Sequence, residues 1–285
     1  MPVDPGRILA YSVPEIVQEL TRRDTILYGL SVGLGADPMD ERQLAFVYEE
    51  GLKALPMMST VLAYPGFWLR RRDTGVDWVK VVHAEQGVRI HRPLPVEGRL
   101  IGRTRMTGLV DKGPGKGALL YSERHVTDAA GDLICTLDMT TFLRGDGGCG
   151  GTTGPAKPTH PTPDRPSDVA VDLSTLPSQA LLYRLNGDLN PLHASPKVAA
   201  AAGFPRPILH GLATFGVIGH ALLKGVCGYR PERLIAMEGR FSSPVYPGET
   251  IRTEIWKEAN GAAAFRARVV ERDKIVLTGG RAEIA

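Results

Sequence analysis

The sequence of 285 residues lacks the features that mark disulfide-rich, nucleic-acid-binding and membrane-spanning chains. Its three cysteines lie far apart, have no metal-ligand spacing and cannot all pair, which indicates free thiols in a reducing compartment. The formal net charge of +3 is small for this length and no basic run stands out, so no nucleic-acid partner is expected. Because no stretch approaches the roughly 20 uninterrupted apolar residues of a spanning helix, no membrane partner is expected either.

The two ends of the sequence carry no recognisable targeting signal. Residues 1–10 contain prolines and charged residues, unlike the apolar region of a signal peptide, and the final RAEIA differs from a peroxisomal signal. We therefore expect a cytoplasmic protein, or a peroxisomal one if the source is eukaryotic. With 43% hydrophobic and 23% charged residues, the composition is that of an ordinary globular protein with room for two domains.

A stretch rich in glycine, proline and threonine divides the chain almost in half. Residues 144–170 read RGDGGCGGTTGPAKPTHPTPDRPSDVA and have no apolar periodicity, which predicts a linker that is part flexible and part stiffened by proline. The halves share a pattern at an offset of about 150 residues, as expected for an internal duplication. PLPVEGRLIGRTR at 93–105 and PVYPGETIRTEI at 244–255 each place two prolines, an acid and a glycine before an alternating strand.

Further strands follow this pattern in each half, and helices precede it. The turn Asp111–Gly117 in the first half and the hairpin signal Asn260-Gly261 in the second are each followed by two predicted strands, at 118–128 and 133–143 and at 263–271 and 275–284. Helical patterns cover 23–33, 40–55 and 212–226, and a shorter helix is bounded by Ser195, Pro196 and Gly203. The sequence therefore predicts an α+β unit, twice over.

An acid, an amide and an imidazole lie within six residues at Asp188, Asn190 and His193. Pro191 excludes a central strand or helix interior, and Gly187 allows backbone angles that other residues avoid, so this is a constrained turn before a helix. A carboxylate and an imidazole in one small volume can hold a water, one taking its proton while the other gives one, as adding water to a double bond requires. The alternative is that Asp188 caps a turn and His193 is structural.

Gly211 stands where the predicted buried helix begins. The unpaired backbone N–H groups of a helix N-terminus can stabilise a developing oxyanion, such as that of a thioester enolate. The alternative is that this glycine only permits close packing of the helix.

Residues 183–216, YRLNGDLNPLHASPKVAAAAGFPRPILHGLATFG, resemble the signature of the 2-enoyl-CoA hydratase 2 family, the MaoC-like dehydratases. The resemblance extends over nearly the whole chain through ILYGLSVGLG, FVYEEG, KVVHAEQGVRIHRPLP, VDKGPGKG and RFSSPVYPGETIRTEIWKE. It implies a double hot-dog fold, in which two antiparallel sheets are each wrapped around a central helix. Residues 1–145 would then form a non-catalytic hot dog that accommodates the acyl group, 146–170 the linker and 171–285 the catalytic hot dog.

The family reaction is the reversible hydration of a trans-2-enoyl-CoA to a (3R)-3-hydroxyacyl-CoA. The resemblance implies that Asp188 and His193 hold and activate the water, that Asn190 helps to place it, and that the Gly211 amide polarises the thioester oxygen. It leaves the roles of acid and base within the pair open. No metal or redox cofactor is implied, because the thioester stabilises the carbanion. The expected partners are an acyl-CoA substrate and a second copy in a homodimer.

The resemblance also implies contacts with CoA in both halves of the chain. They map to His83, Ala84, Lys112, Asp188, Leu189, Asn190, Pro191, Leu192, His193, Gly211 and Phe241. Ala84 departs from the glycine usual in the family, since it adds a methyl group while keeping the backbone groups. Each of these side chains also has an ordinary structural role as its alternative.

Two matters stay open at the level of sequence. Other functions include a dehydratase for another acyl thioester, on acyl carrier protein or with a branched or steroid-side-chain acyl group, a hot-dog thioesterase, or a non-catalytic acyl-CoA binding protein. The acyl group itself is undecided among medium or long straight, branched, steroid and short dicarboxylic chains. Met57, Met58, Phe67 and Trp68 either line its pocket or belong to the core.

Overall fold

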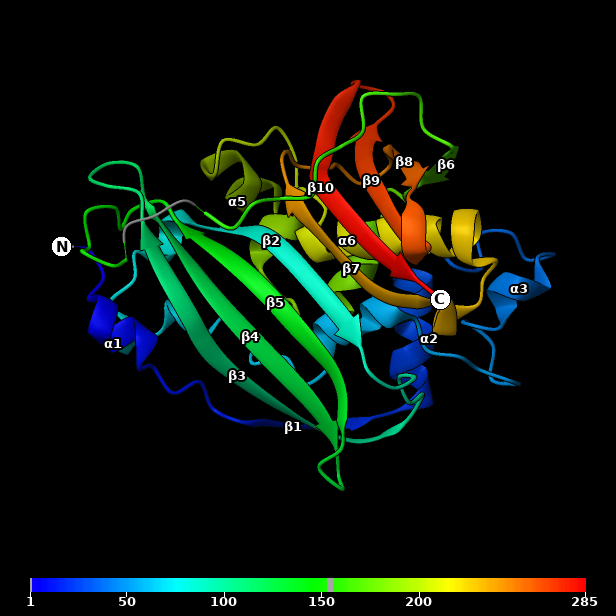
Figure 1. Ribbon diagram of the computed structural model, residues 1–285, viewed down its shortest axis with the longest axis horizontal. Helices are drawn as coiled ribbons and strands as arrows, with labels where there is room; N and C mark the ends of the chain where they lie inside the picture. Colours follow the sequence, from blue (N-terminus) through cyan, green and yellow to red (C-terminus); the bar gives the residue numbers. More distant parts are fainter. Residues whose placement is uncertain (1, 153–155) are drawn as a thin grey trace.

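The computed structural model describes residues 2–152 and 156–285. Within these residues ten strands form one antiparallel sheet in the order β1-β3-β4-β5-β2-β7-β10-β9-β8-β6 (Figure 1). The strands are β1 (Ile16–Leu20), β2 (Val81–Ile90), β3 (Gly98–Asp111), β4 (Ala118–Asp128), β5 (Leu133–Leu143), β6 (Val169–Ser174), β7 (Leu234–Phe241), β8 (Thr250–Lys257), β9 (Ala262–Val269) and β10 (Lys274–Ile284). The four strands that the duplication predicts after the two turns are β4, β5, β9 and β10.

The strand order is symmetric about the contact between β2 and β7. Reading outward from this contact, the first half runs β2-β5-β4-β3-β1 and the second runs β7-β10-β9-β8-β6. In chain order, each half thus has one strand, then a helical region, then four strands. The first of these four strands lies at the contact between the halves. This correspondence confirms the duplication and the double hot-dog fold, with the refinement that the two expected sheets join edge to edge through Glu85–Arg89 and Ala236–Arg240.

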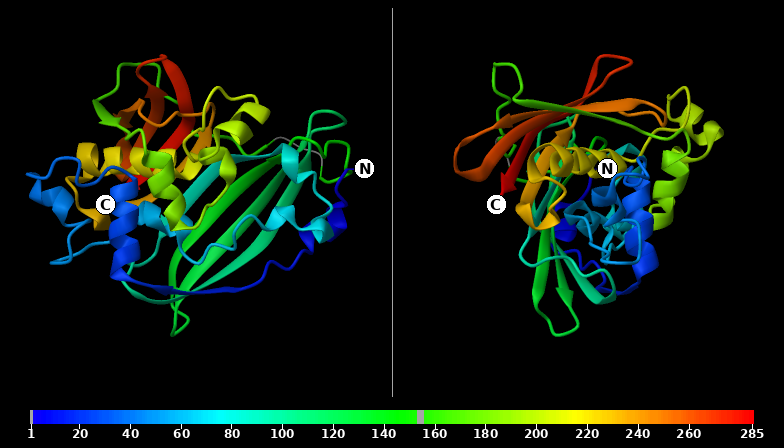
Figure 2. Two further views of the ribbon diagram at one scale, coloured as in Figure 1. Left: turned by 180° about the vertical axis from the view of Figure 1, so that it is seen from behind. Right: turned by 90° about the vertical axis from the view of Figure 1, so that its right-hand side faces the viewer.

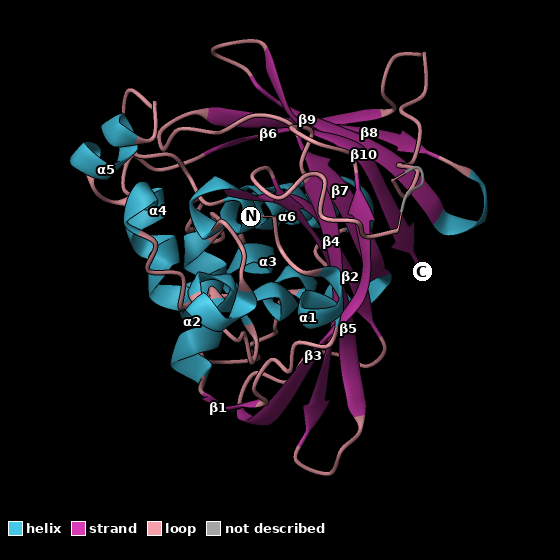
Figure 3. Cartoon of the chain, turned by 90° about the vertical axis from the view of Figure 1, so that its left-hand side faces the viewer, coloured by secondary structure: helices cyan, strands magenta, loops and turns pink. Residues whose placement is uncertain are grey.

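The six α-helices of the described residues lie on one side of the sheet (Figures 2 and 3). They are α1 (Pro5–Leu9), α2 (Arg22–Ser31), α3 (Glu41–Leu44), α4 (Gln179–Tyr183), α5 (Pro196–Ala201) and α6 (Gly211–Leu222), which continues as a π-helical turn, Leu223–Cys227. Ser195 caps α5 by accepting the Val198 N–H, Pro196 is its first residue and Gly203 follows with a φ of +85°. The sequence prediction for this helix is confirmed. Among the described residues, no helix is long and apolar enough to span a membrane.

The central helix is well developed only in the second half. There α6 is buried along ten of its twelve residues. The equivalent region of the first half contains only the 3₁₀ helix η1 (Pro56–Val61). Pro56 and Pro65 bracket this segment, and because proline removes a backbone donor and restricts the residue before it, a long helix does not form there.

The predicted helix at 40–55 is wrong beyond Leu44. The segment after α3 consists of turns, in which Gly51 has a φ of +66° and the Lys53 N–H bonds back to the Ala45 carbonyl. This path buries the Phe46 side chain completely. Gly51 lies inside the range of the predicted helix, and its left-handed backbone conformation is incompatible with a continuous helix. Tertiary burial has overridden helix propensity here.

One hydrophobic core connects the two halves. It includes Tyr28 of α2, Met57 of η1, Phe215 of α6 and Phe265 of β9, all fully buried. The packing of α6 is tight at Gly219, where a Cβ atom would lie 2.2 Å from the Met57 Cγ. This helix therefore holds its position against both the sheet and the first half, and its N-terminus is fixed accordingly.

The segment after the midpoint of the chain lies against the sheet. The Trp256 Nε1–H donates to the Arg165 carbonyl at 2.7 Å, and His160 Nε2 lies 3.0 Å from both carboxylate oxygens of Glu258. Part of the predicted linker, residues 153–155, lies outside the described residues, and the boundaries at 145 and 171 stay a prediction. Cys135, Cys149 and Cys227 are free thiols, as predicted.

Candidate active site

The turn from Asp188 to His193 is fixed by its own side chains. Gly187 has a φ of +112°, which a glycine adopts readily. Asp188 Oδ1 accepts the Asn190 N–H and Asn190 Oδ1 accepts the Leu192 N–H, both at 3.1 Å. Pro191 then begins the 3₁₀ helix η6 (Pro191–His193). The turn is constrained as the sequence predicts, and Asn190 acts within it as a cap.

The His193 ring is held in one tautomer. It is 8% exposed, and its Nδ1 lies 2.9 Å from the Ile208 carbonyl oxygen. Because a carbonyl only accepts, Nδ1 carries the hydrogen and a neutral ring presents its lone pair at Nε2. Burial lowers the pKa of His193, which keeps the ring neutral near pH 7. The structure therefore offers a base at Nε2.

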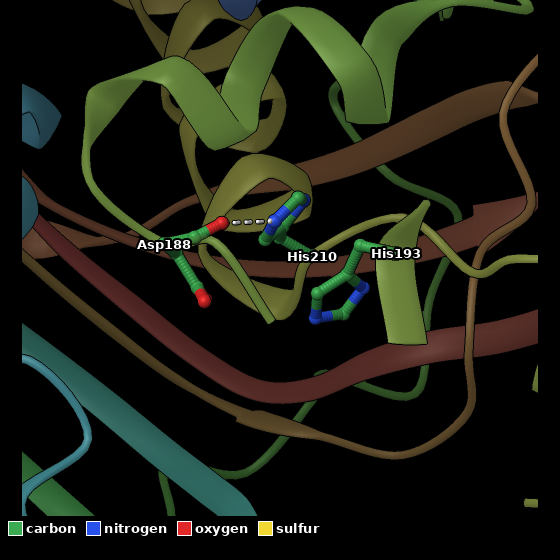
Figure 4. Close-up of side chains that lie close together, drawn as sticks. All are labelled: Asp188, His193 and His210. Carbon is green, nitrogen blue, oxygen red and sulfur yellow. Dashed lines mark hydrogen bonds between the residues drawn. The ribbon is translucent and has the colours of Figure 1, made fainter. Parts of the chain in front are cut away.

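A second histidine, His210, belongs to the same site and is not among the residues that the sequence singled out. Its ring stacks on that of His193, with ring centroids 3.7 Å apart and planes 27° from parallel. Its Nε2–H donates to the main-chain carbonyl of Asp188 at 3.2 Å, as Figure 4 shows. Burial and the neighbouring His193 lower the pKa of His210. Its position next to Gly211 is the signal that could have found it.

Asp188, His193 and His210 also raise the question of a metal. One ligand-type atom from each residue lies within 4.8 Å of those of the other two. The two rings are stacked, however, so their lone pairs lie in two nearly parallel planes and are poorly aimed at one common point, as tetrahedral or octahedral ligation requires. The arrangement suits a hydrogen-bonded water better than a metal ion.

Gly211 is the first residue of α6, directly after His210. The first donor of the α-helical ladder is Thr214, which bonds to the His210 carbonyl at 3.0 Å. The N–H groups of Gly211, Leu212 and Ala213 precede it, as at any helix N-terminus. A Cβ atom on Gly211 would meet the Phe241 ring at 3.6–3.8 Å, an ordinary contact, so packing alone does not demand a glycine here.

His83 brings the first half of the chain to this site. Its ring meets the edge of the Phe241 ring, with centroids 5.1 Å apart, and its Nε2–H donates to the Glu85 carbonyl at 3.0 Å. Burial lowers the pKa of His83 to about 4, against an opposing effect of the nearby Asp188 charge. The register of β2 shifts between His83 and Glu85, which leaves Ala84 as a bulged residue without a partner in β5. Its backbone groups are thus available to a ligand.

The remaining residues that the sequence singled out are exposed, half-buried or inside the core. Lys112 is exposed, with its ammonium 5.1 Å from the centre of the Phe142 ring. Phe142 pairs with Val82, whose side chain points away from that of His83, so Lys112 lies over the opposite face of the sheet.

The other predicted residues differ in burial. Met57, Met58 and Trp68 are core residues and Phe67 is 41% exposed. Leu189, Asn190 and Pro191 are exposed, and Leu192 is half-buried.

Comparison with known proteins agrees with this geometry. Residues 158–279 match the family described as MaoC like domain, and residues 18–145 match the MFE-2 hydratase 2 N-terminal domain. The chain is 38% identical to 3-hydroxyacyl-thioester dehydratase Y of Mycobacterium tuberculosis, over 99% of each chain. It is also 38% identical to the peroxisomal enoyl-CoA hydratase 2 of Arabidopsis thaliana, over 95% of this chain and 93% of the relative.

A solved structure supports the same relationship over the whole length. The crystal structure of a MaoC-like dehydratase from Phytophthora capsici superimposes with a TM-score of 0.86 at 31% identity, covering 99% of this chain and 98% of the other. Sequence, fold and the turn from Asp188 to His193 therefore agree that the chain belongs to the MaoC-like dehydratase family, with an N-terminal half of the hydratase 2 type.

Proposed function

We propose that this protein is an (R)-specific 2-enoyl-CoA hydratase, which reversibly adds water to a trans-2-enoyl-CoA to give a (3R)-3-hydroxyacyl-CoA. The observation that carries the proposal is the approach of the Asp188 carboxylate to the two stacked histidines, immediately before the N-terminus of α6. The names of the relatives, an enoyl-CoA hydratase 2 and a 3-hydroxyacyl-thioester dehydratase, support a hydro-lyase that acts on acyl thioesters.

In the proposed mechanism, a water lies between the Asp188 carboxylate and the His193 Nε2. One of these groups takes a proton from the water as its oxygen bonds to C3 of the enoyl group, and the pair then delivers a proton to C2. Asp188 and His193 act as one coupled unit, so the roles of acid and base are not divided between them. His210 keeps Asp188 in place by donating to its main-chain carbonyl.

Negative charge develops on the thioester oxygen during this step. In this proposal the Gly211 N–H, at the positive end of the α6 dipole, stabilises it. Removing one such donor typically lowers kcat by about 10²–10³. The thioester itself serves as the electron sink, so the proposal includes neither a metal nor a redox cofactor.

CoA would contact His83, the backbone at Ala84, the exposed turn at Leu189–Pro191 and Phe241 in this proposal. Of these residues, Phe241 contacts both Gly211 and His83. Lys112 would reach only a phosphate of a CoA that bends around the end of the sheet, because its ammonium lies over the opposite face. A homodimer and a cytoplasmic or peroxisomal location remain part of the proposal.

The test follows the loss of enoyl-thioester absorbance with crotonyl-CoA and trans-2-decenoyl-CoA while free thiol is measured. We expect absorbance to fall without thiol release, a 3R product, and losses of about 10²–10⁴ in kcat for Asp188→Asn and His193→Gln. Release of free CoA would instead assign a thioesterase. Full activity in both variants would remove Asp188 and His193 from the mechanism.

A further inference from the structure

A buried arginine in the first half has no counter-charge. Arg124, on β4, is only 8% exposed. Its Nη2 donates to the main-chain carbonyls of Thr60 and Ser59 at 2.7 and 3.3 Å, and its Nε is buried with no hydrogen-bond partner among the described residues. Within residues 2–152 and 156–285, no carboxylate lies within ion-pair distance of its guanidinium.

The groups that surround this arginine do not supply the missing charge. Burial raises the pKa of Tyr64 to about 12 and that of Cys135 to about 12, so both are neutral near pH 7. Burial lowers the pKa of Arg124 itself to about 10, which leaves it protonated at the same pH. Because an unpaired buried charge is strongly unfavourable, a site of this kind is expected to receive an anion from outside the chain.

Arg124 lies on the face of the sheet that packs against the core shared by the two halves. Its strand neighbours across the sheet are Thr104 and Leu137, of which Leu137 is part of the core shared by the two halves. The segment that covers it, Ser59–Tyr64, lies directly on the sheet, since a Cβ atom on Gly102 would be 2.4 Å from the Ala63 carbonyl oxygen. Arg124 is thus inside the non-catalytic half and not on its surface.

Tyr64 connects this arginine to the candidate active site. The Arg124 guanidinium lies 5.2 Å from the centre of the Tyr64 ring. After burial, the charge of Asp188 is the next largest influence that raises the pKa of Tyr64, so the phenol is also near the catalytic turn. Tyr64 is only half-buried. Tyr64 is thus a residue that contacts Arg124 and also senses the charge of Asp188.

We infer that Arg124 binds a carboxylate at the far end of the acyl chain, so that the preferred substrates are CoA monothioesters of unsaturated dicarboxylic acids. The inference rests on the proposed function and names its substrate class. Guanidinium and carboxylate match in geometry and form charge-assisted hydrogen bonds, which are the strong ones. A methyl-ended chain would leave the buried charge without a partner, and sites built for a polar group discriminate strongly against analogues that lack it.

The test compares matched substrates on the wild-type protein and on Arg124→Met. The pair is trans-2-hexenoyl-CoA and the CoA monothioester of trans-2-hexenedioic acid, with the longer octene pair beside it. We expect wild-type kcat/KM to favour the carboxylate by about 10- to 100-fold for at least one length. Arg124→Met should remove this preference through a loss on the carboxylate substrate, while activity on the methyl-ended substrate stays within about threefold.

Binding without turnover separates this inference from the proposed function. Calorimetry with adipoyl-CoA and hexanoyl-CoA, which lack the double bond, measures the same preference as a ratio of dissociation constants. If neither enoyl substrate is hydrated but adipoyl-CoA binds more tightly in an Arg124-dependent way, the proposed function fails and the inference holds. If hydration is normal and the two acyl groups bind equally, the inference is overturned.

Two further variants exclude a purely structural role, in which Arg124 only caps the carbonyls at the end of η1. That role predicts equal losses on both substrates and a lower melting temperature for Arg124→Met, and this result would contradict the inference. Arg124→Lys keeps the charge but not the planar fork, so it should retain part of the preference. Arg105→Met removes an exposed arginine of the adjacent strand, paired with Glu123, and should leave the preference unchanged.

Discussion

At the scale of single residues, the candidate site contains two imidazoles that stay neutral near pH 7. His193 and His210 are both buried, and each donates one N–H to a main-chain carbonyl. These bonds fix the tautomers, so the His193 Nε2 is left as an acceptor. The stack opposes charging both rings at once, because two imidazolium ions in contact would repel each other.

This arrangement predicts that His210 acts by positioning Asp188. His210→Phe keeps a ring in the stack but loses the donor to the Asp188 carbonyl, so kcat should fall by about 10- to 100-fold with little change in KM. His210→Gln retains an N–H donor and should recover a large part of the loss in the same absorbance assay. Equal losses in the two variants would mean that the hydrogen bond to Asp188 does not matter.

At the scale of elements, helix α6 begins at Gly211 of the candidate site and has a buried face of small residues. Gly216 packs against Val32 and Gly219 against Met57, with Cβ positions that would lie 2.5 and 2.2 Å from side-chain carbons. The two glycines lower helix propensity but let α6 approach Val32 and Met57 closely. These contacts fix the position of Gly211 relative to the turn from Asp188 to His193. A shift of α6 along its axis would therefore disturb both these core contacts and the position of Gly211 at the candidate site.

We predict that Gly219→Ala overpacks the contact between α6 and η1 and lowers the free energy of unfolding by about 1–3 kcal/mol. Combining it with Met57→Ala, which opens space at the same contact, should cost less than the sum of the two single changes. Denaturant titration of the four proteins in the cycle measures this. Strict additivity would show that Gly219 and Met57 do not share a packing contact in solution.

At the scale of the whole molecule, the two halves share one sheet and one hydrophobic core. The sheet is continuous through β2 and β7, and across this seam Glu85 forms an ion pair with Arg240 at 2.5 Å. The core also extends through both halves, from Leu20 to Ala282. Neither half can bury its share of this core alone.

A single cooperative unfolding transition is therefore expected. Thermal curves followed by far-UV circular dichroism and by tryptophan fluorescence should coincide, since Trp68 and Trp78 report on the first half and Trp256 on the second. Polypeptides of residues 1–152 and 156–285 produced separately should lack cooperative transitions. Two separated transitions in the intact chain would show that the halves unfold independently.

Local features of this protein were predictable from the sequence because neighbouring residues determine them. Pro191 and Gly187 impose the turn, and Ser195 and Pro196 start the helix after it. Alternating side chains define β3 and β8. The resemblance of residues 183–216 to a known signature likewise depends only on the order of residues. The sequence by itself therefore determined the duplication, the family and the residues of the candidate catalytic turn.

Only the tertiary structure decided which distant residues meet. It stacked His210 on His193, brought His83 of the first half beside Phe241, and left Arg124 buried without a carboxylate. It also ended the helix at Leu44 early and placed Lys112 over the other face of the sheet. These outcomes depend on burial and on contacts between residues far apart in the chain, which residue order does not encode locally. The arginine that we infer to select the acyl group therefore became visible only once the sheet and its covering segment were in place.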